Sequence, residues 1–222
     1  MTALDWHPLD YDPPARLAGH GAVLERLDPG RHGRDLFASN GADAEMWRHM
    51  PYGPFADPDA YHAWAEGAAA SDDPAFYAIR GDDGPWTGVA SLMRIDRGNG
   101  VIEIGHIALS AALRRTRTAT AALHLMIAQA FETGFRRVEW KCNAENGASR
   151  RAAARLGFAY EGTFRQHMVV KDRNRDTAWF AILDGDWPAI RTAHLAWLDP
   201  ANFDGSGWQV RAMATAVGRD PG

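Results

Sequence analysis

Paired cysteines and long apolar runs are what this sequence lacks, and each absence excludes a class of protein. The 222 residues contain one cysteine, Cys142, so no disulfide can form within the chain. No apolar run approaches the roughly 20 residues that a membrane-spanning helix needs. The opening segment, MTALDWHPLDYDPP, is acidic and rich in proline. We therefore expect no export signal, no membrane partner and a cytoplasmic location.

Metal-binding motifs are also missing. The nine histidines form neither HExxH nor a pairing with the cysteine at zinc spacing, so we expect no metal site. Hydrophobic residues make up 46% of the chain and charged residues 23%, which excludes a disordered protein. The length indicates one domain. We expect an N-terminal arm over 1–20, a catalytic domain over 21–199 and an irregular tail over 200–222.

Lysine is scarce, and the positive charge is concentrated in one part of the chain. Of the 24 basic residues 22 are arginine, and 13 basic against 5 acidic residues lie between Leu113 and Arg175. This leaves 11 basic and 23 acidic residues for the rest of the sequence. The basic stretch is consistent with an anion-binding site and equally with a solvated basic face. A net charge of −4 and the lack of basic runs longer than two residues argue against nucleic acid as a partner.

Hydrophobic periodicity predicts an α/β domain. Alternation and turn residues predict strands over 23–27, 76–80, 87–95, 101–109, 137–142, 164–170 and 177–183. Helical spacing predicts helices over 35–40, 58–70, 118–134, 148–156 and 187–198, with a turn over 171–176. Because a helix connects the strands over 101–109 and 137–142, these two should be parallel, whereas short turns indicate antiparallel hairpins before them.

The loop 110–118 is the first candidate for chemistry. It contains Arg114, Arg115 and Arg117 and leads directly into the start of a helix, where free backbone N–H groups favour an anion such as phosphate. Read alone, the loop is also compatible with a simple exposed connection.

Further along the chain, several motifs together carry a resemblance. The run EIGHIALS, then Arg114-x-x-Arg117-x-Ala119-Thr120, then Asn146-x-x-Ser149 and LGFAYEG resembles the GNAT superfamily of acyl-CoA-dependent N-acyltransferases over about residues 20–187. Within it the sequence is similar to the Rim type, which acetylates protein N-termini. The resemblance implies a mixed, mostly antiparallel twisted sheet whose parallel strand pair splays apart, flanked by helices. It also implies acetyl-CoA as cosubstrate and a primary amine, on a small molecule or a peptide N-terminus, as acceptor.

The resemblance also implies which residues bind the cosubstrate. The family's pyrophosphate loop reads Arg/Gln-x-x-Gly-x-Gly/Ala, and this chain has Arg117 at the middle glycine. Asn146 would contact the pantetheine arm, although a helix cap is an alternative role for it. The complete predicted set is Ile107, Ala108, Leu109, Arg114, Arg115, Arg117, Thr118, Ala119, Thr120, Asn146 and Ser149.

Catalytic residues are less clearly marked. Many family members have a tyrosine acid where this chain has Ala153, so Ser149 is the predicted acid that protonates the leaving thiolate, with helix capping as its alternative role. Glu103 or His106 would accept the amine proton, although a solvated charge and a core histidine are the alternatives. Residues that would line the acceptor site are Trp47, Trp64, Trp140, Trp179, Arg165, His167, Arg173, Arg175 and Asp176, of which Trp140 and Trp179 fit the core better.

Two functions remain open at this point. The first is acetyl transfer by direct attack of the amine in a ternary complex. The second is an acyl-CoA-binding module or sensor with weakened catalysis, which Ala153 and Arg117 keep open. A homodimer, the acyl group and the identity of the acceptor also remain open.

Overall fold

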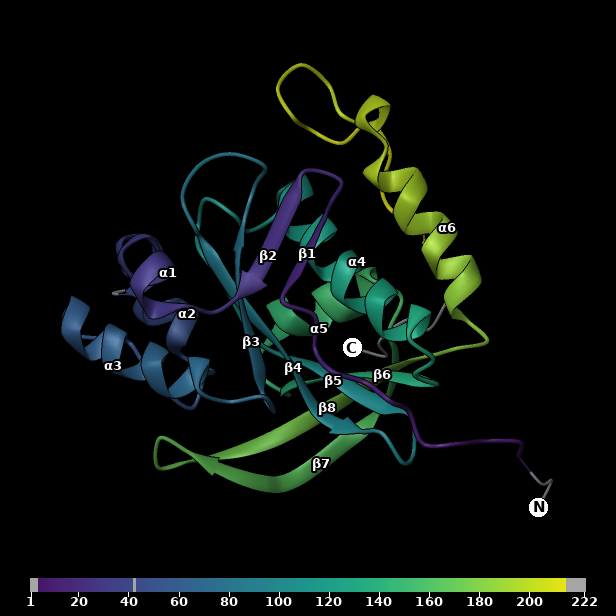
Figure 1. Cartoon of the computed structure of the whole chain (residues 1–222), viewed down its shortest axis with the longest axis horizontal. Helices are drawn as coiled ribbons and strands as arrows, with labels where there is room; N and C mark the ends of the chain where they lie inside the picture. Colours follow the sequence, from purple (N-terminus) through teal and green to yellow (C-terminus); the bar gives the residue numbers. More distant parts are fainter. Residues whose placement is uncertain (1–3, 42, 215–222) are drawn as a thin grey trace.

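One eight-stranded sheet organises the chain in a computed structural model, which describes residues 4–41 and 43–214 (Figure 1). Its strand order is β1-β2-β3-β4-β5-β6-β8-β7. The strands are β1 (Arg16–Gly19), β2 (Ala22–Arg26), β3 (Ala75–Arg80), β4 (Gly88–Asp96), β5 (Val101–Leu109), β6 (Arg137–Asn143), β7 (Ala159–Val170) and β8 (Arg173–Leu183). β5 and β6 are parallel and every other neighbouring pair is antiparallel, which confirms the predicted mixed sheet.

Helices cover both faces of the sheet (Figure 1). One face carries α4 (Arg117–Glu132), α5 (Gly147–Arg155) and α6 (Trp187–Leu198), which is followed by the 3₁₀ turn η2 (Pro200–Asn202). The other carries α1 (Pro29–Leu36), the π-turn η1 (Phe37–Gly41), α2 (Ala44–Trp47) and α3 (Pro58–Ala69). Side chains of Asp28 and Asp57 cap α1 and α3, and a proline follows each cap at the first helical position.

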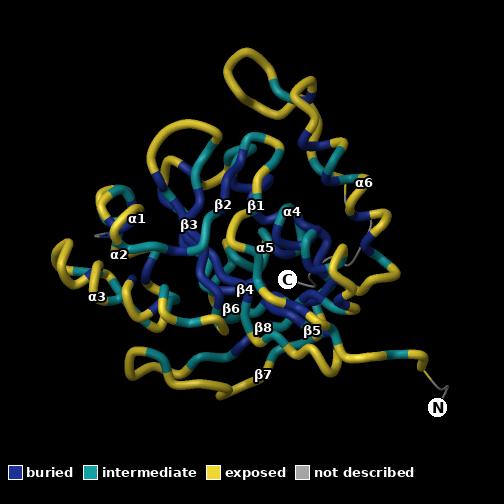
Figure 2. The backbone as a smooth tube through the Cα atoms, in the orientation of Figure 1, coloured by how far each residue is buried: buried dark blue, intermediate teal, exposed yellow. Residues whose placement is uncertain are grey.

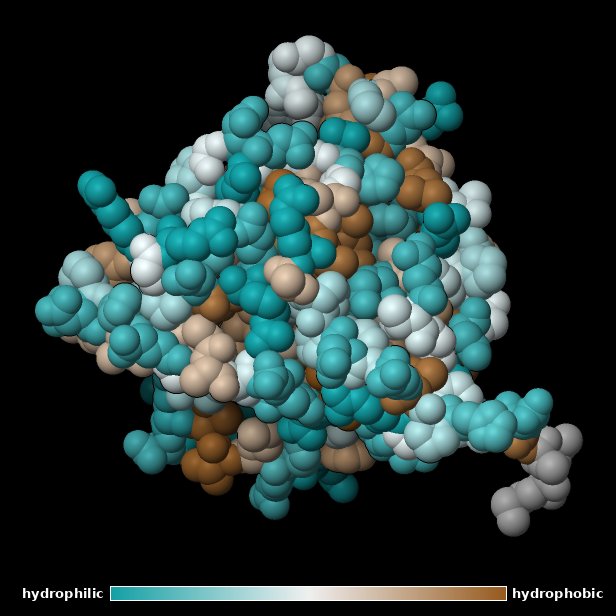
Figure 3. All heavy atoms as spheres, viewed as in Figure 1, coloured by the Kyte–Doolittle hydropathy of each residue, from teal (hydrophilic) through white to brown (hydrophobic). Residues whose placement is uncertain are grey.

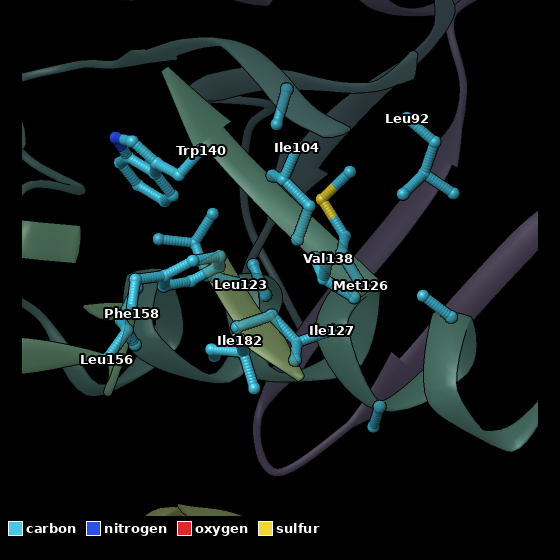
Figure 4. Packing of buried hydrophobic residues seen from close by; sticks show 14 of the residues in the cluster. Leu92, Ile104, Leu123, Met126, Ile127, Val138, Trp140, Leu156, Phe158 and Ile182 are labelled. Carbon is cyan, nitrogen blue, oxygen red and sulfur yellow. The ribbon is translucent and has the colours of Figure 1, made fainter. Parts of the chain in front are cut away.

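Two hydrophobic clusters hold these layers together. Leu123, Met126 and Ile127 of α4 pack on the sheet in the first cluster, and Figure 4 shows them beside Val138 and Ile182. Trp47, Tyr61 and Phe76 belong to the second cluster, on the opposite face. Figure 2 shows the buried residues concentrated in the sheet and α4.

The N-terminal segment differs from the expected arm. Arg16–Gly19 pairs with Ala22–Arg26, so a strand lies within the residues expected to be an arm. Tyr11 is buried, and its hydroxyl donates to Oε1 of Gln129 at 3.0 Å. A four-residue strand has too little alternation to be recognised in the sequence, and its pairing with β2 is what defines it.

Other element boundaries also differ from those predicted from the sequence. The predicted turn over 171–176 is shorter, because β8 already begins at Arg173 and only Lys171 and Asp172 adopt the turn, with φ of 49° and 58°. β7 begins at Ala159, five residues before its predicted start. The predicted irregular tail contains η2 and a bridge between Phe203 and Gln209, and residues 215–222 lie outside the described residues. No helix in the described part of the chain is long and apolar enough to cross a membrane.

Candidate active site

The parallel strand pair separates near the middle of the sheet. β5 and β6 pair at three positions, Val101 with Arg137, Ile102 with Val138 and Glu103 with Glu139. β5 nevertheless continues to Leu109 and β6 to Asn143, so the two strands part after Glu103. Within the described part of the chain, backbone groups on this side of β5 beyond Glu103 are therefore left without a partner strand.

A bulge in β5 accompanies the separation. Ser91 of β4 pairs with Gly105 and Val89 pairs with Ala108, which places one extra residue on β5. His106 lies in this bulge with φ of 51°. A bulge bends its strand and redirects side chains, so β5 turns away from β6 at the same place. Ile107, Ala108 and Leu109, the residues expected to pair with pantetheine, follow directly.

The loop after β5 ends at the start of α4. The Thr116 hydroxyl donates to the Leu113 carbonyl at 2.8 Å and accepts the N–H of Ala119 at 3.1 Å, which makes Thr116 the helix cap. The N–H groups of Arg117 and Thr118 lie in the first turn of α4 and have no acceptor within the helix. These two donors and the positive end of the helix dipole form a site suited to phosphate.

The three arginines of this loop have different surroundings. Arg114 Nη2 lies 3.0 Å from Asp43 Oδ2, and Arg115 is exposed with φ of 65°. Arg117 donates from Nε and Nη2 to the carbonyl of Leu198 at 2.9 and 2.7 Å. The side chain of Arg117 therefore holds the C-terminal end of α6 against the loop, and its backbone N–H is the part left for a phosphate.

The start of α4 also contacts its neighbours through two threonines. The Thr118 hydroxyl donates to the Gly21 carbonyl at 3.3 Å, and Thr120 Oγ1 accepts from Arg155 Nη1 at 3.2 Å. Ala119 is buried between them. These contacts fix the first turn of the helix, so its free N–H groups keep a constant direction.

Asn146 and Ser149 have distinct roles at the start of α5. Asn146 Oδ1 accepts the N–H of Ser149 at 3.0 Å, so the alternative role considered for Asn146, a helix cap, is the one seen here. Ser149 lies three residues inside the helix and does not cap it. Its Oγ accepts from Trp140 Nε1 at 2.9 Å, which leaves its own proton available for donation. Ala153 is completely buried.

Glu103 lies at the point where β5 and β6 part. Its Oε2 is 3.1 Å from Arg94 Nε and 3.0 Å from Lys141 Nζ, and its side chain is buried. Burial raises the pKa of Glu103, against the opposing effect of Lys141 and Arg94. The raised pKa makes Glu103 a stronger proton acceptor than a free carboxylate, and Arg94 and Lys141 hold it in place.

His106 is the other predicted base. Its Nδ1 lies 2.8 Å from Tyr52 Oη, and the two rings stack at an interplanar angle of 16°. Burial, and then the charges of Arg175 and Arg94, lower the pKa of His106 to about 4. The imidazole is therefore neutral at pH 7, and it is a weaker proton acceptor than a free imidazole.

A contact that the sequence does not indicate closes the side of the site next to His106. Lys171, in the turn between β7 and β8, donates from Nζ to the carbonyls of Trp47, Tyr52 and Gly53 at 2.9, 3.2 and 2.6 Å. The hairpin thus holds the loop between α2 and α3 beside His106. Tyr52 and Lys171 were not predicted as site residues. The only signal in the sequence is the proline- and glycine-rich loop MPYGPF.

The remaining predicted acceptor residues are dispersed. Trp47 and Trp140 are buried, and Trp64 packs among aromatic side chains. Trp179 is partly exposed, with Lys141 Nζ 3.8 Å from its ring centroid. On the hairpin of β7 and β8, His167 Nδ1 lies 2.9 Å from Thr177 Oγ1, and the Asp176 carboxylate accepts the N–H of Gln166. Arg165 and Arg173 are exposed, whereas Arg175 is half-buried.

β7 also exposes apolar side chains, those of Phe164, Met168 and Val169. Hydrophobic atoms are visible in Figure 3 at the lower left, where Figure 1 draws this hairpin.

Within the described residues, no group of three histidine, cysteine or carboxylate side chains is arranged to hold a metal ion.

This fold and site define a GNAT acetyltransferase. The chain belongs to that family: residues 23–159 match the family model described as an acetyltransferase (GNAT) domain. No curated protein matches the chain.

Solved structures support the same assignment. A GCN5-related N-acetyltransferase from Brucella melitensis is 43% identical, with a TM-score of 0.91 over 94% of this chain and 96% of that one. A probable acetyltransferase of the GNAT family from Chromobacterium violaceum ATCC 12472 is 45% identical, with a TM-score of 0.80 over 85% and 97% of the two chains. RimJ from Mycobacterium smegmatis, in complex with CoA-disulfide, is 21% identical with a TM-score of 0.63 over 82% and 91%, a similarity that shows the fold alone.

Proposed function

We propose that this protein transfers an acetyl group from acetyl-CoA to a primary amine by direct attack in a ternary complex. The observation that carries the proposal is the separation of β5 and β6 beside the uncapped N–H groups of α4. An unpaired strand edge suits the amide groups of a pantetheine arm. A helix start with adjacent arginines suits a pyrophosphate.

Binding of the cosubstrate follows from this arrangement. Ile107, Ala108 and Leu109 would pair through their backbone with pantetheine. The N–H groups of Arg117 and Thr118 would meet the pyrophosphate, with Arg114 and Arg115 adding positive charge. Asn146 would act indirectly, because its side chain fixes the start of α5 and thereby Ser149.

Proton transfer in this reaction needs an acid for the leaving thiolate and a base for the amine. Ser149 donates its hydroxyl proton to the thiolate that leaves, while Trp140 Nε1 holds the serine oxygen in place. Glu103, whose pKa is raised by burial, or His106, which is neutral at pH 7, accepts the proton of the attacking amine through water. The acceptor is a small-molecule amine or a peptide N-terminus, the latter being the substrate class of the Rim type that the sequence resembles.

Two measurements on the purified protein test the proposal. Acetyl-CoA at one hundred times its dissociation constant should stabilise the native state by about 2.7 kcal/mol, which raises the melting temperature. Thiol release from acetyl-CoA should then depend on added amines and peptides. Stabilisation by CoA without thiol release for any amine would support the sensor alternative, and stabilisation by duplex DNA but not by CoA would refute both.

A further inference from the structure

Among the described residues, the guanidinium of Arg175 near His106 has no hydrogen-bond or ion-pair partner. The guanidinium of Arg175 is half-buried on β8, and its Nε is shielded from solvent without a hydrogen-bond acceptor among the described residues. Within that part of the chain, no carboxylate forms an ion pair with it, whereas the nearby Arg94 and Lys141 are both paired with Glu103. A buried charged donor without a partner is costly, so it is expected where a ligand supplies the acceptor.

The sheet register places Arg175 beside the separated strands. Thr177 of β8 pairs with Asn143, the last residue of β6, and the N–H of Ala144 donates to the carbonyl of Asp176 at 2.9 Å. Arg175 therefore lies just beyond the end of β6. On its other side it pairs with Met168 of β7 within the hairpin that Lys171 fastens over the site.

Arg175 also acts electrostatically on two histidines. Together with the larger effect of burial, its charge lowers the pKa of His106 in the β5 bulge, and it contributes to the lowered pKa of His49 after α2. The Arg175 guanidinium therefore lies close to the imidazoles of His106 on β5 and His49 after α2. Burial lowers the pKa of Arg175 itself, against the smaller opposing effects of Cys142 and Glu103, and Arg94 and Lys141 already pair with the Glu103 carboxylate.

We propose that Arg175 binds a carboxylate of the acceptor, so that the acceptor is an amine that also carries a carboxylate, as an amino acid does. The inference rests on the proposed function, because it assigns the substrate class of the same site. The planar fork of arginine donates two parallel hydrogen bonds to a carboxylate, which gives direction as well as charge. The amine of the same molecule would then be presented to His106.

Two bisubstrate compounds test this without knowledge of the natural acceptor. Each joins the sulfur of CoA through a –CH₂–CO– linker to the nitrogen of either L-alanine or L-alaninamide. Titration calorimetry with the wild-type protein should show that the alanine compound binds about 10- to 100-fold more tightly than the alaninamide compound.

Arg175→Gln should abolish this preference while it leaves the affinity for CoA unchanged. Arg34→Gln is the matched control, because it removes the same charge from an exposed position on α1 and should retain the preference. Equal binding of the two compounds by the wild type, or a preference that persists in Arg175→Gln, would overturn the role of Arg175. Failure of CoA itself to bind the wild type would instead overturn the proposed function.

Discussion

Ser149 is where the structure allows stability and catalysis to be separated. Ser149→Ala removes the acceptor of the Trp140 Nε1 hydrogen bond, which is 2.9 Å long, and Trp140 is only 3% exposed. A buried N–H left without an acceptor costs about 1–3 kcal/mol of unfolding free energy. If Ser149 is also the acid, turnover should fall on the order of 10²-fold. Chemical denaturation measures the first effect and thiol release the second.

The double variant Trp140→Phe/Ser149→Ala distinguishes the two effects. Removing both partners of a buried hydrogen bond is far less costly than removing one. In a double-mutant cycle, Ser149→Ala should therefore destabilise the Trp140→Phe background by about 1–3 kcal/mol less than it destabilises the wild type. Turnover should stay low in every variant that lacks the serine. Wild-type turnover in Ser149→Ala, or turnover that returns together with stability in the double variant, would refute the acid role.

Three further predictions concern other contacts. The buried pair His124 and His194 has Nδ1 atoms 3.1 Å apart, and burial lowers the pKa of His124 to about 3 and of His194 to about 4. The unfolded histidines bind protons below about pH 6.5, whereas the folded ones stay neutral to a lower pH. The free energy of unfolding should therefore be highest above about pH 6.5 and fall toward pH 4, by about 1.4 kcal/mol per pH unit per histidine. Denaturation at several pH values measures this loss. Arg117→Ala should lower the free energy of unfolding by about 1–3 kcal/mol and change the affinities for CoA and for a pantetheine thioester to the same extent. Arg115→Ala should weaken the binding of CoA alone. A selective loss of CoA affinity in Arg117→Ala, measured by calorimetry and with unchanged stability, would contradict this. Lys171→Met should raise KM for the acceptor about 5- to 10-fold and leave CoA affinity unchanged, and steady-state kinetics with an unchanged KM would count against its role in closing the site.

Local patterns in the sequence were sufficient for much of the fold. The 3.6-residue spacing of Leu123 and Ile127 identified α4, since a helix with one buried face repeats its apolar residues at that period. A strand, a helix and a strand in succession require a crossover, so the parallel pair β5 and β6 followed without tertiary information. The predicted loop 110–118 before this helix followed in the same way, although α4 already begins at Arg117.

Only the tertiary structure decided the contacts between residues far apart in the chain. β1 is too short for a periodic signal and exists because it pairs with β2. No local rule could show that Arg117 would reach the carbonyl of Leu198, 81 residues away, rather than a phosphate. Lys171 likewise binds carbonyls 118 to 124 residues earlier. Side-chain partners at such separations depend on how the whole sheet packs, and that packing determines which of the predicted charges are left without a partner and therefore available for a ligand.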